Sequence, residues 1–210
     1  MTYGANAAIL YRPEAFTTSG TKLMGRQAAG DGFMRGFVRH ANVEKLYCYT
    51  PRREHVEHFA AAAQANGNTR PIAWLNEADP RTPAETGTLH LPGPSISASA
   101  WRRRRFDQRA YSIVGLTHTI ASSGAMDWIT GQLTAPVQEW DAQICTSRVA
   151  RETLEFMYHT QAEFLAARLG ATKFPKPRLP VIPLGVDTDA FAPDPGRRAE
   201  ARQAFGVAED

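Results

Sequence analysis

The sequence has few cysteines and no long hydrophobic run. Its two cysteines, Cys48 and Cys145, are too few for a disulfide framework or a four-cysteine zinc site. Each lies in a short apolar stretch, so we expect buried, reduced thiols. No stretch approaches the roughly 18 apolar residues that cross a bilayer, and residues 1–6 lack a basic start followed by an apolar core. We therefore expect a cytoplasmic protein.

Phosphate-binding glycine motifs are also missing. The chain has no Gly-Lys-Ser/Thr loop, which argues against a P-loop enzyme. Gly30-Asp-Gly32-Phe-Met-Arg-Gly36 superficially resembles a dinucleotide fingerprint, but one residue too many separates its second and third glycines. The segment also lies inside a predicted helix instead of directly after a strand. We therefore interpret these glycines as positions of close helix packing.

Composition is otherwise ordinary, with one exception in the distribution of charge. Hydrophobic residues make up 43% of the 210 residues, charged residues 21%, and the formal net charge is +3, which suits one globular α/β domain. Four consecutive arginines, Arg102 to Arg105, lie beside Trp101 and Phe106. They could meet a charged acceptor, an anionic membrane surface or nucleic acid, but arginines spread around a helix cannot all face one ligand. An ordinary solvated segment is the alternative, and we expect no nucleic-acid partner.

Predicted strands alternate with predicted helices along the chain. The strands are expected at 7–11, 43–49, 71–75, 89–91, 111–117 and 140–146, with a last, buried strand ending at Val181 and Ile182. The helices are expected at 24–40, 52–66, from 95 or 97 to 106, at 126–133 and at 148–169. This alternation predicts an α/β fold, a Rossmann-like three-layer α/β/α domain with a mainly parallel sheet. Ligands on such sheets bind at the carboxyl ends of the strands.

Three loops therefore hold the candidate site. The loop after the first strand, 14–23, contains Ser19, Gly20, Thr21 and Lys22, which offer backbone amides and an ammonium group to an anion. His118 follows the strand that ends at Thr117, and its ring can face the cleft or serve as a hydrogen-bonded structural residue. Ser147 is the predicted N-cap of the long helix that ends at Gly170.

Two pairs of residues raise the question of a metal. Asp187 and Asp189 have the Asp-x-Asp spacing that can hold a divalent cation, but they lie among turn formers after Gly185, where positive φ would allow a sharp turn. His55 and His58 can share one helical face, but a third ligand is not evident nearby. We expect turn residues and solvated surface, and no bound metal.

The end of the chain carries a resemblance to a known family. Pro180-Val-Ile-Pro-Leu-Gly-Val-Asp-Thr-Asp-Ala-Phe-Ala-Pro193 resembles the interdomain junction of retaining glycosyltransferases of the GT4 type (glycosyl transferases group 1), with Leu184 where asparagine is common. The resemblance implies that residues 1–193 form the N-terminal, acceptor-side domain of a GT-B fold. Residues 194–210, with a short helix within 197–206, would then be a linker to an absent donor-binding domain.

The resemblance also implies an activity and a set of site residues. A complete enzyme of this type transfers a sugar from a nucleotide-sugar donor to a hydroxyl acceptor, which in some members is lipid-linked or phosphorylated, without a catalytic metal or cofactor. Thr117-His-Thr119 is similar to the position where a family histidine contacts the transferred sugar, so His118 is the expected catalytic residue. The expected substrate-binding residues are Ser19, Gly20, Thr21, Lys22, Gly25, Thr119 and Ser147.

The same interpretation predicts the binding partners of the chain and leaves two alternative functions. The donor would be held mainly by the absent domain, so we expect the isolated chain to be nearly inactive, and the arginine cluster could make a peripheral membrane contact. A nucleotide-sugar epimerase half would need acidic catalytic groups that the sequence does not reveal. A noncatalytic module that binds a phosphorylated or anionic partner is the rival from another class.

Overall fold

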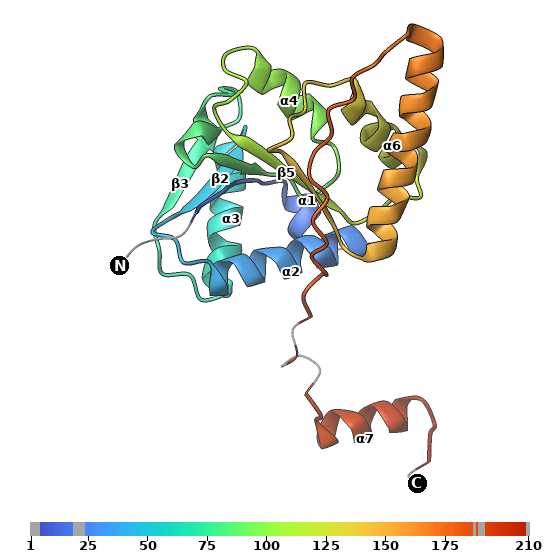
Figure 1. Ribbon diagram of the computed structural model, residues 1–210. Helices are drawn as coiled ribbons and strands as arrows, with labels where there is room; N and C mark the ends of the chain where they lie inside the picture. The colour runs from blue at the N-terminus through green and yellow to red at the C-terminus, as the bar shows by residue number, and fades with distance from the viewer. Residues whose placement is uncertain (1–4, 19–23, 187, 189–191, 209–210) are drawn as a thin grey trace.

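The computed structural model describes residues 5–18, 24–186, 188 and 192–208. Its centre is a parallel sheet of six strands in the order β3-β2-β1-β4-β5-β6. The strands are β1 (Ala8–Leu10), β2 (Leu46–Thr50), β3 (Ile72–Asn76), β4 (Thr88–His90), β5 (Ser112–Thr117) and β6 (Ala142–Cys145). Helices cover both faces (Figure 1). The predicted Rossmann-like α/β/α fold is confirmed.

The helices divide between the two faces of the sheet. One face carries α1 (Pro13–Phe16), α2 (Gly25–His40) and α3 (Arg53–Ala65), and the other carries α4 (Ser97–Arg104), α5 (Ser123–Thr130) and α6 (Arg148–Leu169), with short 3₁₀ turns at Thr82–Glu85 and Gly131–Leu133. This division follows from the strand order. Right-handed crossovers that move outward from β1 and from β4 in opposite directions place their helices on opposite faces.

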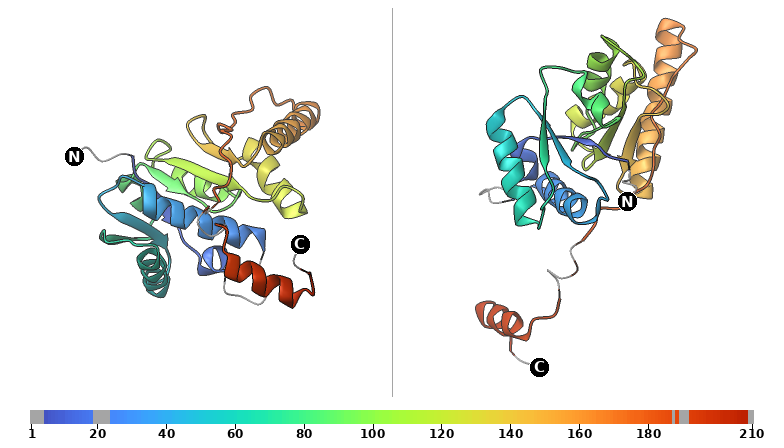
Figure 2. Two further views of the ribbon diagram at one scale, coloured as in Figure 1. Left: turned by 90° about the horizontal axis from the view of Figure 1, so that it is seen from below. Right: turned by 90° about the vertical axis from the view of Figure 1, so that its left-hand side faces the viewer.

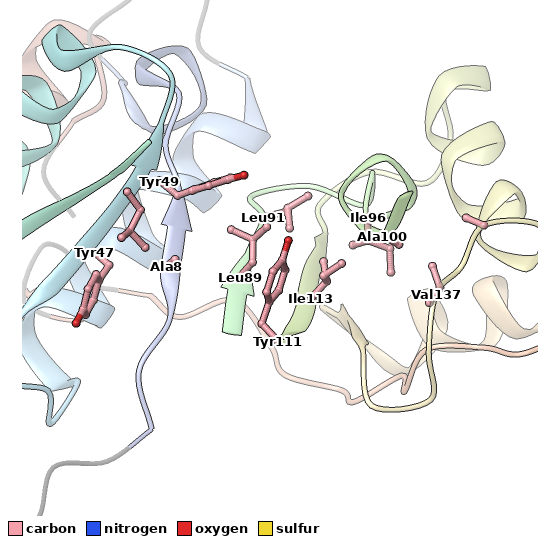
Figure 3. Packing of buried hydrophobic residues seen from close by; sticks show 12 residues of the cluster. Ala8, Tyr47, Tyr49, Leu89, Leu91, Ile96, Ala100, Tyr111, Ile113 and Val137 are labelled. Carbon is pink, nitrogen blue, oxygen red and sulfur yellow. The ribbon is translucent and has the colours of Figure 1, made fainter. Parts of the chain in front are cut away.

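Alternate residues of the strands supply two of the three apolar clusters. Ile9 and Cys48 point toward α2 and α3, whereas Ala8, Leu89 and Ile113 point toward α4. Figure 3 shows side chains of β1, β4 and β5 gathered with Ile96 and Ala100 of the α4 segment. Both cysteines are free and fully buried, as predicted, and burial raises the pKa of Cys48 to about 12 and that of Cys145 to about 11.

Helix boundaries follow the capping signals in the sequence. The Ser147 hydroxyl accepts a hydrogen bond from the Ala150 amide at 3.0 Å, so α6 begins at the predicted residue. Gly67 and Gly170 have φ angles of +85° and +67°, the left-handed conformation that ends α3 and α6. The loop predicted after β1 is in part helical, because Pro13 favours a first helical position and starts α1.

The prediction of a last, buried strand that ends at Val181 and Ile182 is wrong, because this segment is neither a regular strand nor fully buried. Residues 178–182 run parallel to β6 through two isolated bridges, Ala142 to Arg178 and Cys145 to Val181. Pro180 and Pro183 lack amide protons, so the ladder cannot continue, and Ile182 is 52% exposed. The sequence allows a turn with positive φ at Gly185, but Gly185 is not among the described glycines whose φ is positive.

Beyond this edge the chain leaves the sheet. Helix α7 (Pro195–Ala204) is drawn apart from the rest of the molecule (Figures 1 and 2) and buries none of its residues. Its N-cap, Asp194, accepts hydrogen bonds from the amides of Gly196 and Arg197. The division of the chain at residue 193 stays a prediction. Within the described ranges, no helix is both long enough and apolar enough to cross a bilayer.

Candidate functional site

The strand order reverses between β1 and β4, and this is where a doubly wound sheet opens a ligand crevice. The chain leaves β1 toward α1 and α2, and leaves β4 through the turn Pro92-Gly93-Pro94 toward α4. The Gly93 carbonyl accepts a hydrogen bond from the Leu116 amide at 3.2 Å, which holds this turn against β5. The candidate site is built around this crevice.

His118 lies directly after β5, at the carboxyl edge of the sheet, as the sequence predicts. Its side chain is half-buried, and its Nδ1 is buried without a hydrogen-bond partner among the described residues. A Cβ atom added to Gly93 would lie 3.3 Å from the His118 Nε2 atom. Glycine therefore lets the turn after β4 approach the Nε2 side of the imidazole closely.

The first turn of α2 supplies positive charge to the same place. Burial lowers the pKa of His118, and the nearby Arg26 guanidinium lowers it further. The imidazole is therefore neutral near pH 7, with one nitrogen able to donate and the other to accept. Arg26 and Gly25 are exposed at the N-terminus of this helix, where the positive end of the helix dipole favours an anion.

The remaining predicted site residues differ in what the structure says of them. Thr119 is exposed next to His118, and Ser147 is exposed after β6, where its hydroxyl oxygen caps α6. The Thr146 hydroxyl donates to the Thr117 carbonyl at 3.1 Å, which ties the ends of β5 and β6 together. Ser19, Gly20, Thr21 and Lys22 lie outside the described residues, so their phosphate role stays a prediction.

A cluster of charged side chains at the carboxyl edge of the sheet was not predicted from the sequence. Arg12 follows β1, Glu77 follows β3 and Arg102 belongs to α4. The Glu77 carboxylate is 2.5 Å from the Arg12 Nη2 atom and 3.3 Å from the Arg102 Nη1 atom. Two guanidinium groups share one carboxylate, which leaves a net positive charge beside the crevice. The available signal was positional, because Arg12 and Glu77 each come just after a predicted strand.

The alternative interpretation of the four arginines, an ordinary solvated segment, does not hold for all of them. Arg103 is fully buried with Asp141, and Arg102 pairs with Glu77. Arg104 lies over the Trp101 ring at 6.0 Å, and Arg105 is exposed. The four side chains do point to different surroundings, as the helical arrangement predicts.

The two histidines on α3 contact hydroxyl groups. His55 Nδ1 is 3.1 Å from the Thr50 hydroxyl, and His58 Nδ1 is 2.8 Å from the Tyr11 hydroxyl. Each ring thus contacts the hydroxyl group of a buried residue. The expected solvated surface holds for His58, which is exposed, whereas His55 is partly buried. Across the described parts of the chain no three His, Cys, Asp or Glu side chains are grouped to hold a metal ion. Asp187 and Asp189 lie outside those parts.

A groove of about 750 Å³ runs along α2, between this helix, the ends of β4, β5 and β6, and the segment after β6. It is lined by Gly25, Ala28, Ala29, Gly32, Phe33, Gly36, Phe37, His40, Ala41, His90, Leu116, Ile144 and residues 182–186. The His90 ring stacks on Phe33 with centroids 4.1 Å apart. The His90 Nε2 atom is buried and has no hydrogen-bond partner in the described ranges, and burial lowers the pKa of His90 to about 4.

We compared the chain with models of known protein families, with curated proteins and with solved structures, and none of the three comparisons finds a match.

Proposed function

We propose that this chain is the N-terminal, acceptor-side domain of a retaining glycosyltransferase of the GT4 type with GT-B architecture. The carrying observation is the convergence of His118, Gly93 and the first turn of α2 at the carboxyl edge of the sheet. The sheet order and the junction-like segment 180–193 support the same proposal.

In this proposal the neutral His118 imidazole hydrogen-bonds a hydroxyl of the transferred sugar. Its ring is half-buried at the carboxyl edge of the sheet, and a neutral imidazole nitrogen can donate to or accept from that hydroxyl. The Arg26 guanidinium and the amides of α2 would stabilise a phosphate of the donor or acceptor. Ser19 to Lys22, directly before α2 in the chain, would extend this anion site.

The reaction would need a second wall. Residues 178–182 follow β6 to the carboxyl edge, and the Gly185 carbonyl then comes within 3.9 Å of the Cβ position of Gly32 on α2. A domain attached after this segment would start beside the crevice. Donor and acceptor react efficiently only when both are held in register, so the 210-residue chain alone would have little activity.

Titration of the isotope-labelled chain with nucleotide sugars and candidate hydroxyl acceptors, followed by amide NMR shifts, tests the proposal. We expect binding to perturb residues around His118, Gly93 and Arg26, with acceptors binding more tightly than donors. His118→Ala should weaken this binding, whereas His159→Ala, at an exposed histidine of α6, should not. Turnover of a nucleotide sugar by this chain at the rate of an intact enzyme would refute the assignment of the donor site to another domain.

The second candidate is a noncatalytic module for an anionic partner, which the exposed Arg104 and Arg105 favour. Binding of a polyanion that depends on these two arginines, together with no sugar or acceptor binding at His118, would select it.

A further inference from the structure

A surface on the α4 side of the sheet combines exposed arginines with aromatic rings. We define the Arg–Trp surface by the side chains of the last turn of α4, the turn that follows it and the loop before β6: Trp101, Arg104, Arg105, Phe106, Arg109 and Trp140. Arg104 lies over the Trp101 ring at 6.0 Å, and Arg109 lies over the Trp140 ring at 5.7 Å. Each pair holds a guanidinium group against an aromatic ring.

The packing of α4 fixes which of its side chains face outward. Ala100 and Arg103 are buried against the sheet, so the helical repeat turns Trp101 and Arg105 toward solvent. Trp101 is 53% exposed and Phe106 is 38% exposed. Large aromatic side chains at these exposures leave apolar area that the protein itself does not cover.

Within the part of the chain that the structure describes, the arginines of this surface have no carboxylate partner. Arg104, Arg105 and Arg109 form no ion pair within the described residues. Asp141, the nearest buried carboxylate in this region, is occupied by Arg103. Asp107 accepts a hydrogen bond from the Arg109 backbone amide at 2.8 Å, which shapes the turn. The positive charge is therefore available to an external anion.

We propose that the Arg–Trp surface docks the protein on an anionic lipid membrane. Guanidinium groups attract phosphate head groups, and tryptophan rings gain free energy at the boundary between head groups and acyl chains. Nucleic acid fits less well, because three arginines make only a short cationic track along a phosphate backbone. Each arginine contributes modestly, so the contact is reversible and sensitive to salt. This inference is independent of the proposed transferase activity.

Vesicle co-sedimentation tests the docking. We expect the full chain to sediment with vesicles of phosphatidylglycerol and phosphatidylcholine but to stay in solution with phosphatidylcholine alone, and high salt should release it. Arg104→Glu/Arg105→Glu should lower the partition coefficient at least about tenfold. Trp101→Ala should lower it several-fold and reduce the blue shift of tryptophan fluorescence on binding.

A matched control places the same charge change elsewhere. Arg52 and Arg53 are exposed at the start of α3, on the opposite face of the sheet, and Arg52→Glu/Arg53→Glu should keep most of the vesicle binding. Circular dichroism of every variant checks that it is folded. The proposal is overturned if the wild type ignores anionic vesicles, or if both double variants lose binding equally. Tighter binding to duplex or single-stranded RNA than to the vesicles, lost in Arg104→Glu/Arg105→Glu, would also overturn it.

Discussion

The Arg103 guanidinium and the Asp141 carboxylate form a two-pronged ion pair in which both side chains are fully buried. The Nη1 and Nη2 atoms lie 2.6 Å and 2.8 Å from the two carboxylate oxygens. Asp141 also accepts hydrogen bonds from the amides of Ile113 and Gln138, each at 2.8 Å. One carboxylate thus joins α4, β5 and the loop that precedes β6.

Removal of the arginine should therefore be costly. Arg103→Ala leaves the Asp141 charge buried without its partner, and we expect a loss of about 3–5 kcal/mol in the free energy of unfolding. Urea denaturation measures it. Arg104→Ala, one residue along the same helix, should cost less than about 0.5 kcal/mol because its side chain is exposed. Equal losses for the two variants would show that the buried pair does not stabilise this fold.

The sequence could not single out Arg103. Four identical residues carry no sign of which one faces the sheet, and the choice depends on Asp141, which is 38 positions away. The elements themselves were easier to predict, because the periods of apolar residues and the caps are local. Arg148–Leu169 agrees with its prediction because Ser147 and Gly170 mark both of its ends.

The site was predictable in part for the same reason. A histidine after a parallel strand must lie at the carboxyl edge, so the place of His118 follows from the strand pattern. Its contact with Gly93 and its nearness to Arg26 depend on how β4 and α2 pack, which no local pattern encodes. The last strand was overestimated because Val181 and Ile182 suggest burial, whereas Pro180 and Pro183 prevent regular pairing.

Two glycines of α2 offer a matched test of helix packing. A Cβ atom at Gly30 would lie 2.1 Å from the Ala15 carbonyl oxygen of α1, whereas one at Gly36 would meet nothing within 4 Å. Gly30→Ala should destabilise the fold by about 1–3 kcal/mol because the α1 and α2 backbones must separate. Gly36→Ala should stabilise it by about 0.5–1 kcal/mol through helix propensity. Thermal and urea unfolding of both variants measure these changes. If Gly30→Ala stabilised the fold, the close packing of α1 against α2 at Gly30 would be contradicted.

Burial of His90 should make stability depend on pH. The folded state keeps this ring neutral down to about pH 4, whereas the unfolded chain takes up the proton near pH 6.5. The unfolded state thus binds more protons within this interval, so the free energy of unfolding should fall as pH drops from about 6.5 toward 4, by at most about 3 kcal/mol.

Variants separate this effect from other titrations. His90→Leu should flatten the pH dependence of the free energy of unfolding in that interval, because the leucine side chain does not titrate. Denaturant titrations at a series of pH values provide the comparison. If His90→Leu keeps the full slope, another group causes the acid sensitivity.

His118 provides the most direct test of the site's electrostatics. Burial is the larger cause of its lowered pKa and Arg26 the smaller, so NMR titration of the imidazole should give a midpoint below 6.5. Arg26→Gln should raise that midpoint without restoring 6.5, because the burial remains. Arg53→Gln, on α3, should not move it. A bound phosphate compound should raise the midpoint of the wild type, because added negative charge favours the imidazolium. No change with Arg26→Gln would mean that the guanidinium does not reach the crevice, and the anion site assigned to the start of α2 would then be wrong.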